Sequence, residues 1–175
     1  MKVDVAHTAH LGSRTLSAVR ALLDAAFDGD FSAADWEHAL GGMHATAWDG
    51  DELVGHASVV QRRFLHQGRA LRTGYVEAVA VRASHRRRGV GAAVMGPLED
   101  IIRAAYDLGA LASSDMAVPL YTARGWQRWQ GPSSVLSPDG VIPTPEEDGE
   151  IHVFPVTTVD VTVGLVCDWR DGDVW

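Results

Sequence analysis

Four arginines and two glycines stand together between residues 82 and 91, where they could bind a phosphate-bearing ligand. Arg82 precedes the run Arg86–Arg88, and Gly89 and Gly91 then open a segment with helical periodicity. Glycine lets a backbone approach a ligand closely, and the unpaired N–H groups of a helix start attract anions. Arginines add charge-assisted hydrogen bonds. The residues alone leave two interpretations, an anion-binding turn or an exposed basic loop.

Two further side chains could move protons. Glu77 interrupts the otherwise apolar run 76–81 directly before the basic loop. A carboxylate withdrawn from water has a raised pKa, as a general base working near neutrality requires. The alternative is an edge-strand glutamate that faces solvent. Tyr121 carries a phenol that could act as a general acid, unless it is simply a core aromatic.

Acidic residues gather in three other parts of the chain, where they could bind a cationic ligand. On their own such residues usually form solvated surface. They are Asp30 and Asp35, then Glu146, Glu147 and Asp148, then Asp168, Asp171 and Asp173.

The single cysteine and the histidines offer less chemistry. Cys167 ends the apolar run GLVC without an activating histidine nearby, so we expect a buried, inert thiol. Histidine pairs such as His7 with His10, or His38 with His44, have no accompanying ligand set. We therefore expect no metal.

The elements that must position these residues alternate between strands and helices. Ser13 and Ser32 could cap two early helices, and a third helix is predicted over residues 90–108, distorted but not ended by Pro97. Residues 126–129 and 134–138 suggest a hairpin. Strand-like runs fall at 3–11, 43–48, 52–66, 70–82, 110–114, 151–158 and 161–169. The order predicts an α/β domain with a mixed sheet and a βα unit in its middle.

Length and charge narrow the class of protein. The 175 residues suit one domain, residues 1–175, and the net charge of -8 argues against a general nucleic-acid binder. No apolar run approaches the roughly 18–20 residues that span a bilayer, and we see no signal peptide. We therefore expect a cytoplasmic protein that binds neither nucleic acid nor membrane.

Three segments resemble motifs of the Gcn5-related N-acetyltransferase (GNAT) superfamily. The stretch RRRGVGA at 86–92 is similar to its [Q/R]-x-x-G-x-[G/A] motif. The preceding EAVAV at 77–81 resembles its splayed fourth strand, and LYTARGW at 120–126 resembles its late helix. The resemblance implies a single acyltransferase domain with splayed central strands.

Most of the chain resembles one branch, the aminoglycoside 2′-N-acetyltransferases. The segments that carry this likeness include GDFSAADWEHALGGMHA, VVQRRFL, ALRTGYVEAVAVRA and CDWRDGDVW. The resemblance implies acetylation of an aminoglycoside 2′-amine in a ternary complex, resistance to these antibiotics, and a homodimer. A related enzyme acting on a peptide, a lysine or another amino sugar stays open, whereas Glu77 and Tyr121 argue against a non-catalytic coenzyme A sensor.

The resemblance also implies roles for individual residues. Glu77 is the base, acting through water, and Tyr121 is the acid beside the sulfur of acetyl-CoA. Backbone groups of Val79, Ala80 and Val81 pair with the pantetheine arm. Apart from the resemblance, we expect backbone N–H groups of the 77–81 strand to donate to the oxyanion. The pyrophosphate is held by Arg86, Arg87, Arg88, Gly89, Val90, Gly91 and Ala92.

The polycationic acceptor is expected to meet carboxylates and one main-chain group. These contacts are Asp30, Asp35, Glu77, the main chain at Ala78, Glu147, Asp173 and the terminal carboxylate of Trp175. The branch has glycine where Ala78 stands, serine where Ala112 stands, and aspartate where Glu147 stands. Ser113 or Ser114 could replace the missing serine. These departures bear on which aminoglycosides fit.

Overall fold

The computed structural model describes all 175 residues, and the chain divides into two compact units. The first unit comprises Met1–Val60 with Val76–Ile101, and the second comprises Gln61–Tyr75 with Ile102–Trp175. Three elements contribute residues to both units: β3 (Glu52–His66), β4 (Arg69–Val81) and α3 (Val90–Ala105).

The first unit begins with a strand and two helices. Strand β1 (Lys2–His7) pairs antiparallel with β2 (Met43–Asp49), which pairs antiparallel with β3. A short 3-10 turn, η1 (Thr8–His10), leads to α1 (Ser13–Ala26), and α2 (Ala33–Ala39) follows.

The two helix starts differ in how they are capped. Ser32 caps α2 as predicted, within a reciprocal capping box with Asp35. The prediction for Ser13 is wrong, because Ser13 is the first residue of α1 and Gly12 is its cap. The N-terminus of α1 therefore has no side-chain cap.

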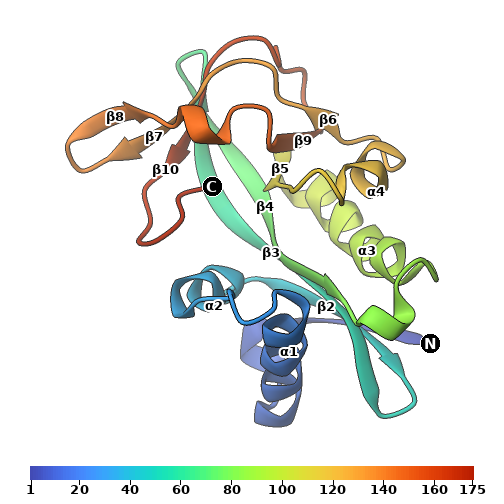
Figure 1. The fold of residues 1–175 in the computed structure, drawn as a ribbon. Coiled ribbons are helices and arrows are strands. Elements are labelled where there is room, and N and C mark those ends of the chain that lie inside the picture. Colours follow the sequence, from blue (N-terminus) through green and yellow to red (C-terminus); the bar gives the residue numbers. More distant parts are fainter. The chain divides into compact units, whose positions relative to one another are not determined.

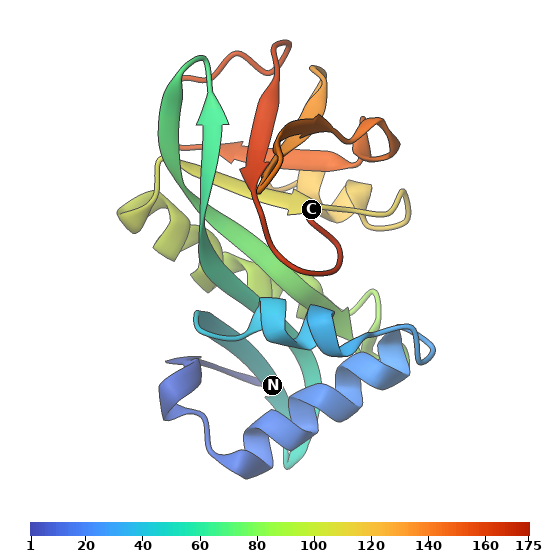
Figure 2. The same ribbon diagram turned by 90° about the vertical axis from the view of Figure 1, so that its left-hand side faces the viewer.

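Helices lie on both sides of the strands of the first unit (Figures 1 and 2). The apolar face of α1, with Val19, Leu22 and Leu23, packs with Leu53 and Ala80 into one core cluster. The start of α3 comes close to β3 at Gly55, where an added Cβ would collide with Val90. A glycine is required there because the helix leaves no room for a side chain.

The second unit is built mainly of strands. Its strand order is β6-β9-β5-β4-β3-β10-β7-β8, with parallel pairs β4–β5 and β7–β10 among antiparallel ones. The mixed sheet confirms the predicted α/β class. The added elements are β5 (Leu108–Ala112), α4 (Val118–Thr122), β6 (Gln127–Arg128), β7 (Ser133–Ser137), β8 (Gly140–Pro143), η3 (Pro145–Glu147), β9 (Ile151–Pro155) and β10 (Leu165–Asp168).

The predicted hairpin of 126–129 with 134–138 is wrong. Strand β6 pairs with β9, and β7 pairs with β8 and β10. The N–H groups of Gln130 and Gly131 both donate to the carbonyl of Val161 at 2.9 Å, so the chain leaves β6 toward another segment. The turn residues between the predicted strands 126–129 and 134–138 do not indicate which strands pair.

Strand β4 changes surroundings at its middle. Its parallel register with β5 covers Thr73–Tyr75 against Leu108–Ala110, and from Val76 onward β4 belongs to the first unit. A short 3-10 turn, η2 (Ala83–His85), then leads to α3. Pro97 lies inside α3, which continues past it as predicted. None of the helices is long and apolar enough to span a membrane.

Candidate active site

The turn between β4 and α3 has the geometry of an open cradle. Arg86, Arg87 and Arg88 are exposed, and Arg87 and Gly89 have φ values of 58° and 81°. Nothing lies within 4 Å of a Cβ placed on Gly89, so its backbone faces open space. The buried Val90 then anchors the first turn of the 16-residue helix α3. Free N–H groups at a helix start beside three exposed guanidinium groups suit a pyrophosphate.

Arg82 has a structural place instead. Its Nε donates to the carbonyl of Leu53 at 3.2 Å and lies 3.1 Å from the Glu52 carboxylate. Its backbone N–H donates to the carbonyl of Val54 at 2.9 Å. Arg82 therefore ties the end of β4 to β3, and the basic run at 86–88 carries the exposed positive charge.

The backbone of β4 is irregular at the predicted base. Glu77 is half-buried, and Ala78, directly after it, has a φ of 52°. A side chain in this left-handed region costs roughly 1–2 kcal/mol, whereas glycine adopts it freely. The glycine expected at this position in the branch thus has a physical reason, and Ala78 adopts the positive φ under strain. We call this irregular stretch of β4, Glu77 and Ala78, the bulge.

Two side chains of β3 hold the carbonyl groups of this bulge. The Ser58 hydroxyl donates to the carbonyl of Glu77 at 3.4 Å, and His56 Nδ1 lies 2.8 Å from the carbonyl of Ala78. His56 Nε2 in turn lies 2.9 Å from His44 Nδ1. The contact between His44 and His56 was not anticipated from the sequence. The available signal was a histidine within the mostly apolar run 43–48, because buried polar groups are almost always hydrogen-bonded.

Tyr121 is buried in α4, only 4% exposed. Its ring lies 6.0 Å from that of Trp126 and 6.4 Å from that of His152. Burial raises the pKa of Tyr121 to about 12, so the phenol keeps its proton at neutral pH. The tyrosine is a packed aromatic residue that also retains a proton to donate.

Two of the predicted acceptor contacts lie close enough to repel each other. Burial, followed by the charges of Asp173, Glu150 and Glu146, raises the pKa of Glu147 to about 6. The carboxylate of Asp173 also accepts the N–H of Trp175 at 3.1 Å. The second unit therefore contains a local excess of negative charge, which a cation would relieve.

The segment that follows β10 is folded back and anchored at its end, as Figure 2 shows. The Trp175 side chain is 3% exposed, its ring lies 5.2 Å from that of Phe64, and its Nε1 donates to Thr144 Oγ1 at 2.8 Å. Arg170 donates to the carbonyl of Asp173 at 2.7 Å and to a main-chain oxygen of Trp175, part of the predicted terminal carboxylate, at 2.8 Å. Asp173 is thus held by Arg170 and by the N–H of the buried Trp175.

The remaining residues predicted to contact the acceptor differ in how exposed their polar groups are. Asp30 is exposed, but one oxygen of Asp35 accepts the N–H of Ser32 at 2.8 Å in the α2 cap. Ser113 is 8% exposed and its hydroxyl donates to the carbonyl of Ser114 at 3.0 Å. Ser114 is exposed. Of the two serines, Ser114 is the one whose hydroxyl reaches solvent.

The predicted residues divide between the two units. Asp30, Asp35, residues 77–81 and residues 86–92 belong to the first, and Tyr121, Glu147, Asp173 and Trp175 belong to the second. Within the first unit the predicted base, Glu77, lies next to Ala78, and β4 is followed by η2 and then by the basic turn. Within the second unit Glu147 and Asp173 interact.

Cys167 has the surroundings expected of an inert thiol. Its side chain is fully buried and donates to the carbonyl of Val174 at 3.3 Å. Burial raises its pKa to about 11, although Arg62 nearby acts in the opposite direction. The thiolate needed for a covalent route is therefore scarce at neutral pH.

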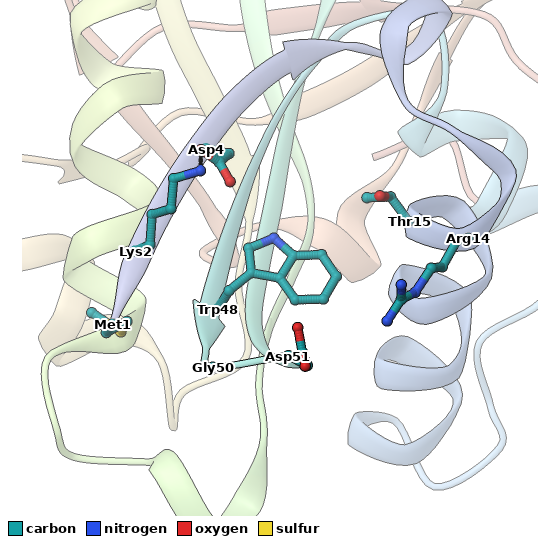
Figure 3. A pocket seen from close by; sticks show the side chains of 8 residues that line it. All are labelled: Met1, Lys2, Asp4, Arg14, Thr15, Trp48, Gly50 and Asp51. Atoms are coloured by element: carbon teal, nitrogen blue, oxygen red, sulfur yellow. Dashed lines mark ion pairs between the residues drawn. The ribbon is translucent and has the colours of Figure 1, made fainter.

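A separate open hollow of about 560 Å³ lies in the first unit, between β1, α1 and the β2–β3 turn. Figure 3 shows the indole of Trp48 in its middle, with Arg14 and Thr15 on the side of α1. Lys2 and Asp4 form an ion pair of 2.8 Å on its rim. The hollow contains none of the predicted site residues.

Comparison with known proteins agrees with this geometry. The model of the acetyltransferase (GNAT) family matches residues 16–126. An aminoglycoside 2′-N-acetyltransferase from Mycolicibacterium fortuitum is 53% identical over 97% of this chain and 89% of its own.

Solved structures share the fold at low sequence identity. Escherichia coli ElaA matches 87% of this chain and 97% of its own with a TM-score of 0.61 and 20% identity. The GCN5-related N-acetyltransferase from Kribbella flavida matches 75% of this chain with a TM-score of 0.61, also at 20% identity, but only 34% of its own longer chain. The chain belongs to the acetyltransferase (GNAT) family.

Proposed function

We propose that this protein transfers an acetyl group from acetyl-CoA to the 2′-amino group of an aminoglycoside. The observation that carries the proposal is the 53% identity, over 97% of the chain, with a protein named for that activity. The open cradle at 86–92 and the repulsive pair Glu147 and Asp173 support it, because they suit a pyrophosphate and a polycation respectively.

The proposed chemistry divides between three groups of the chain. Acetyl-CoA, when bound, supplies the thioester carbonyl. An acceptor ammonium with a pKa near 10 must lose a proton before it attacks, and Glu77 accepts that proton through water. Backbone N–H groups of 77–81 stabilise the charge that develops on the carbonyl oxygen. Tyr121, whose raised pKa keeps its phenol protonated, gives a proton to the departing sulfur.

Cofactor placement follows from the same segments. Backbone groups of Val79, Ala80 and Val81 pair with the pantetheine arm, and the pyrophosphate lies on the turn that contains Gly89 and Gly91. The exposed guanidinium groups of 86–88 and the positive φ of Gly89 support this assignment. No metal takes part in the proposed reaction.

The acceptor is held by charge. Asp30, the free oxygen of Asp35, Glu147 and Asp173 neutralise its ammonium groups, together with the main chain at Ala78 and the terminal carboxylate of Trp175. Ser114 replaces the serine that the branch has at position 112. A longer Glu147 in place of aspartate reaches further toward the acceptor and alters the choice among aminoglycosides.

The cellular setting is part of the proposal. We place residues 1–175 as one domain in the cytoplasm, acting as a homodimer and lowering sensitivity to aminoglycosides. Strand β8 is the last in the sheet order, and Leu136, Val141 and Ile142 are exposed apolar residues on β7 and β8. An apolar edge strand of this kind is suited to pairing with a second copy.

Thiol release from acetyl-CoA tests the proposed activity directly. Aminoglycosides with a free 2′-amine should stimulate release, and matched compounds with a 2′-hydroxyl should not. Mass spectrometry of the product should place one acetyl group on the 2′-nitrogen. Stimulation by peptides or other amino sugars alone would replace the acceptor while keeping the family, and no stimulation by any 2′-amino compound would refute the proposal.

A further inference from the structure

Three buried or half-buried side chains form a continuous hydrogen-bonded chain that ends on the β4 bulge. Thr8 Oγ1 lies 2.7 Å from His44 Nε2, and His44 Nδ1 lies 2.9 Å from His56 Nε2. His56 Nδ1 then lies 2.8 Å from the carbonyl oxygen of Ala78. Both imidazole side chains are fully buried. We call Thr8, His44 and His56 the relay.

The direction of each bond in the relay follows from its end at Ala78. The carbonyl of Ala78 can only accept, so His56 carries its proton on Nδ1. In a neutral ring Nε2 of His56 then accepts from His44 Nδ1, and Nε2 of His44 accepts from the hydroxyl of Thr8. The N–H of Gly41 donates to that hydroxyl at 2.9 Å.

Both rings are neutral under ordinary conditions. Burial, aided by the charge of His7, lowers the pKa of His44 to about 4. Burial, opposed by the bond to Ala78 and aided by His44, lowers the pKa of His56 to about 3. Each ring thus presents one donor and one acceptor, and the relay uses all four.

His56, at one end of the relay, contacts Ala78, the residue of β4 with a positive φ. Ala78 has a φ of 52°, and its side chain packs against the core cluster of α1. The carbonyl of the preceding Glu77 is also held by a β3 side chain, that of Ser58, which is fully buried. Two consecutive carbonyl groups are thus held by side chains of one neighbouring strand. A conformation that costs an alanine energy persists only where its surroundings fix it.

We propose that the relay is a positioning device, which holds the Ala78 carbonyl and so fixes the bulge between Glu77 and the N–H groups of residues 79–81. Its importance for acetyl transfer rests on the function proposed above. A shift of about 1 Å in a catalytic group can lower a rate roughly a hundredfold. The relay links that placement to η1 and to Gly41, far from the bulge in sequence.

Substitutions at His56 test the relay. His56→Leu removes the donor to Ala78, and we expect kcat to fall roughly ten- to a hundredfold with a much smaller change in KM for acetyl-CoA. His56→Asn keeps an N–H near the position of Nδ1 and should retain most of the rate. Thr46→Val is the matched control, because Thr46 is a buried polar residue of β2 that does not contact β4 in any of its hydrogen bonds.

Rescue separates positioning from a general loss of stability. Glycine adopts a positive φ without strain, so Ala78→Gly should restore a substantial part of kcat to the His56→Leu variant. Melting temperatures of all variants are recorded together with the rates. A kcat for His56→Leu close to that of Thr46→Val, or no recovery in the double variant, would overturn the proposal.

Hydrogen exchange decides the question even if aminoglycosides are not the acceptors. Amide protons of residues 77–81 should exchange faster in His56→Leu than in the parent protein and in Thr46→Val. Failure of the proposed function would appear as no turnover in the parent protein, with this difference intact. Unchanged exchange at 77–81 would refute the relay's role whatever the substrate is.

Discussion

The bulge of β4 differs in its treatment of polar groups from the acidic cluster of the second unit, which we define as Glu146, Glu147, Glu150 and Asp173. At the bulge, His44 and His56 are buried and neutral, and each ring nitrogen has a partner. Around Glu147 several carboxylates lie near one another, and burial followed by their repulsion raises the pKa of Glu147 to about 6. The buried polar groups at the bulge are hydrogen-bonded without a ligand, whereas the carboxylates of the acidic cluster repel one another.

The two regions suit two different tasks. The bulge suits the placement of a catalytic group, and the acidic cluster suits the recognition of a cation. A base that must stand at one position is supported best by neutral hydrogen bonds, whose geometry is directional. A site for a cation is prepared by charges of one sign, which destabilise the free protein and are stabilised on binding. We therefore expect changes near the bulge to affect kcat, and changes in the acidic cluster to affect KM and stability.

The largest expected effect is at the base. Glu77→Gln keeps the size of the side chain and removes its basicity, so kcat should fall by roughly 10²- to 10⁴-fold. The KM for the aminoglycoside should rise far less. Steady-state kinetics with Glu37→Gln, an exposed position on α2, provide the control. A loss confined to KM would place Glu77 with the recognition residues instead.

The next effect concerns stability in acid. In the unfolded chain a histidine has a pKa near 6.5. In the folded protein burial lowers the pKa of His44 to about 4 and that of His56 to about 3, so the unfolded chain binds protons that the folded protein does not. The free energy of unfolding should therefore fall as the pH drops below 6.5, by about 2 kcal/mol for each histidine at pH 5.

Urea unfolding at pH 7 and pH 5 measures this loss. The His56→Asn variant should lose less stability between the two values than the parent protein, because it has one buried imidazole fewer. His10, exposed in η1, supplies the control substitution His10→Asn. Equal losses in all three proteins would show that the relay is not the acid-sensitive element.

The smallest effect is expected in the acidic cluster. Glu147→Gln removes a charge repelled by its neighbours, so the folded protein should gain about 1 kcal/mol at neutral pH after allowance for solvent screening. The KM for the aminoglycoside should rise roughly tenfold, because one anionic contact is lost. Thermal melting and kinetics measure the two changes. Glu146→Gln, at the neighbouring exposed position, is the control. A similar rise in KM in that variant would show that the overall negative charge of the cluster, and not a contact of Glu147, is responsible.

Much of the fold was predictable because its signals are local. The strands at 43–49, 52–66 and 69–81, the helix cap at Ser32 and the continuous helix across Pro97 all follow from periodicity, turn residues and caps. The hairpin proposed for 126–138 failed because strand pairing is decided by distant segments. There the carbonyl of Val161 binds the chain that leaves β6.

The sequence by itself determined the chemistry that was available: a carboxylate before a basic, glycine-containing turn, a late tyrosine and an excess of acid. It also determined that Cys167, in an apolar run, would be buried. Only the tertiary structure joined His44 and His56 to Ala78, because this contact depends on the register of β2 and β3 and on a positive φ in β4. Such a contact leaves no periodic pattern in the chain, since it is made by side chains from separate strands meeting one irregular backbone position.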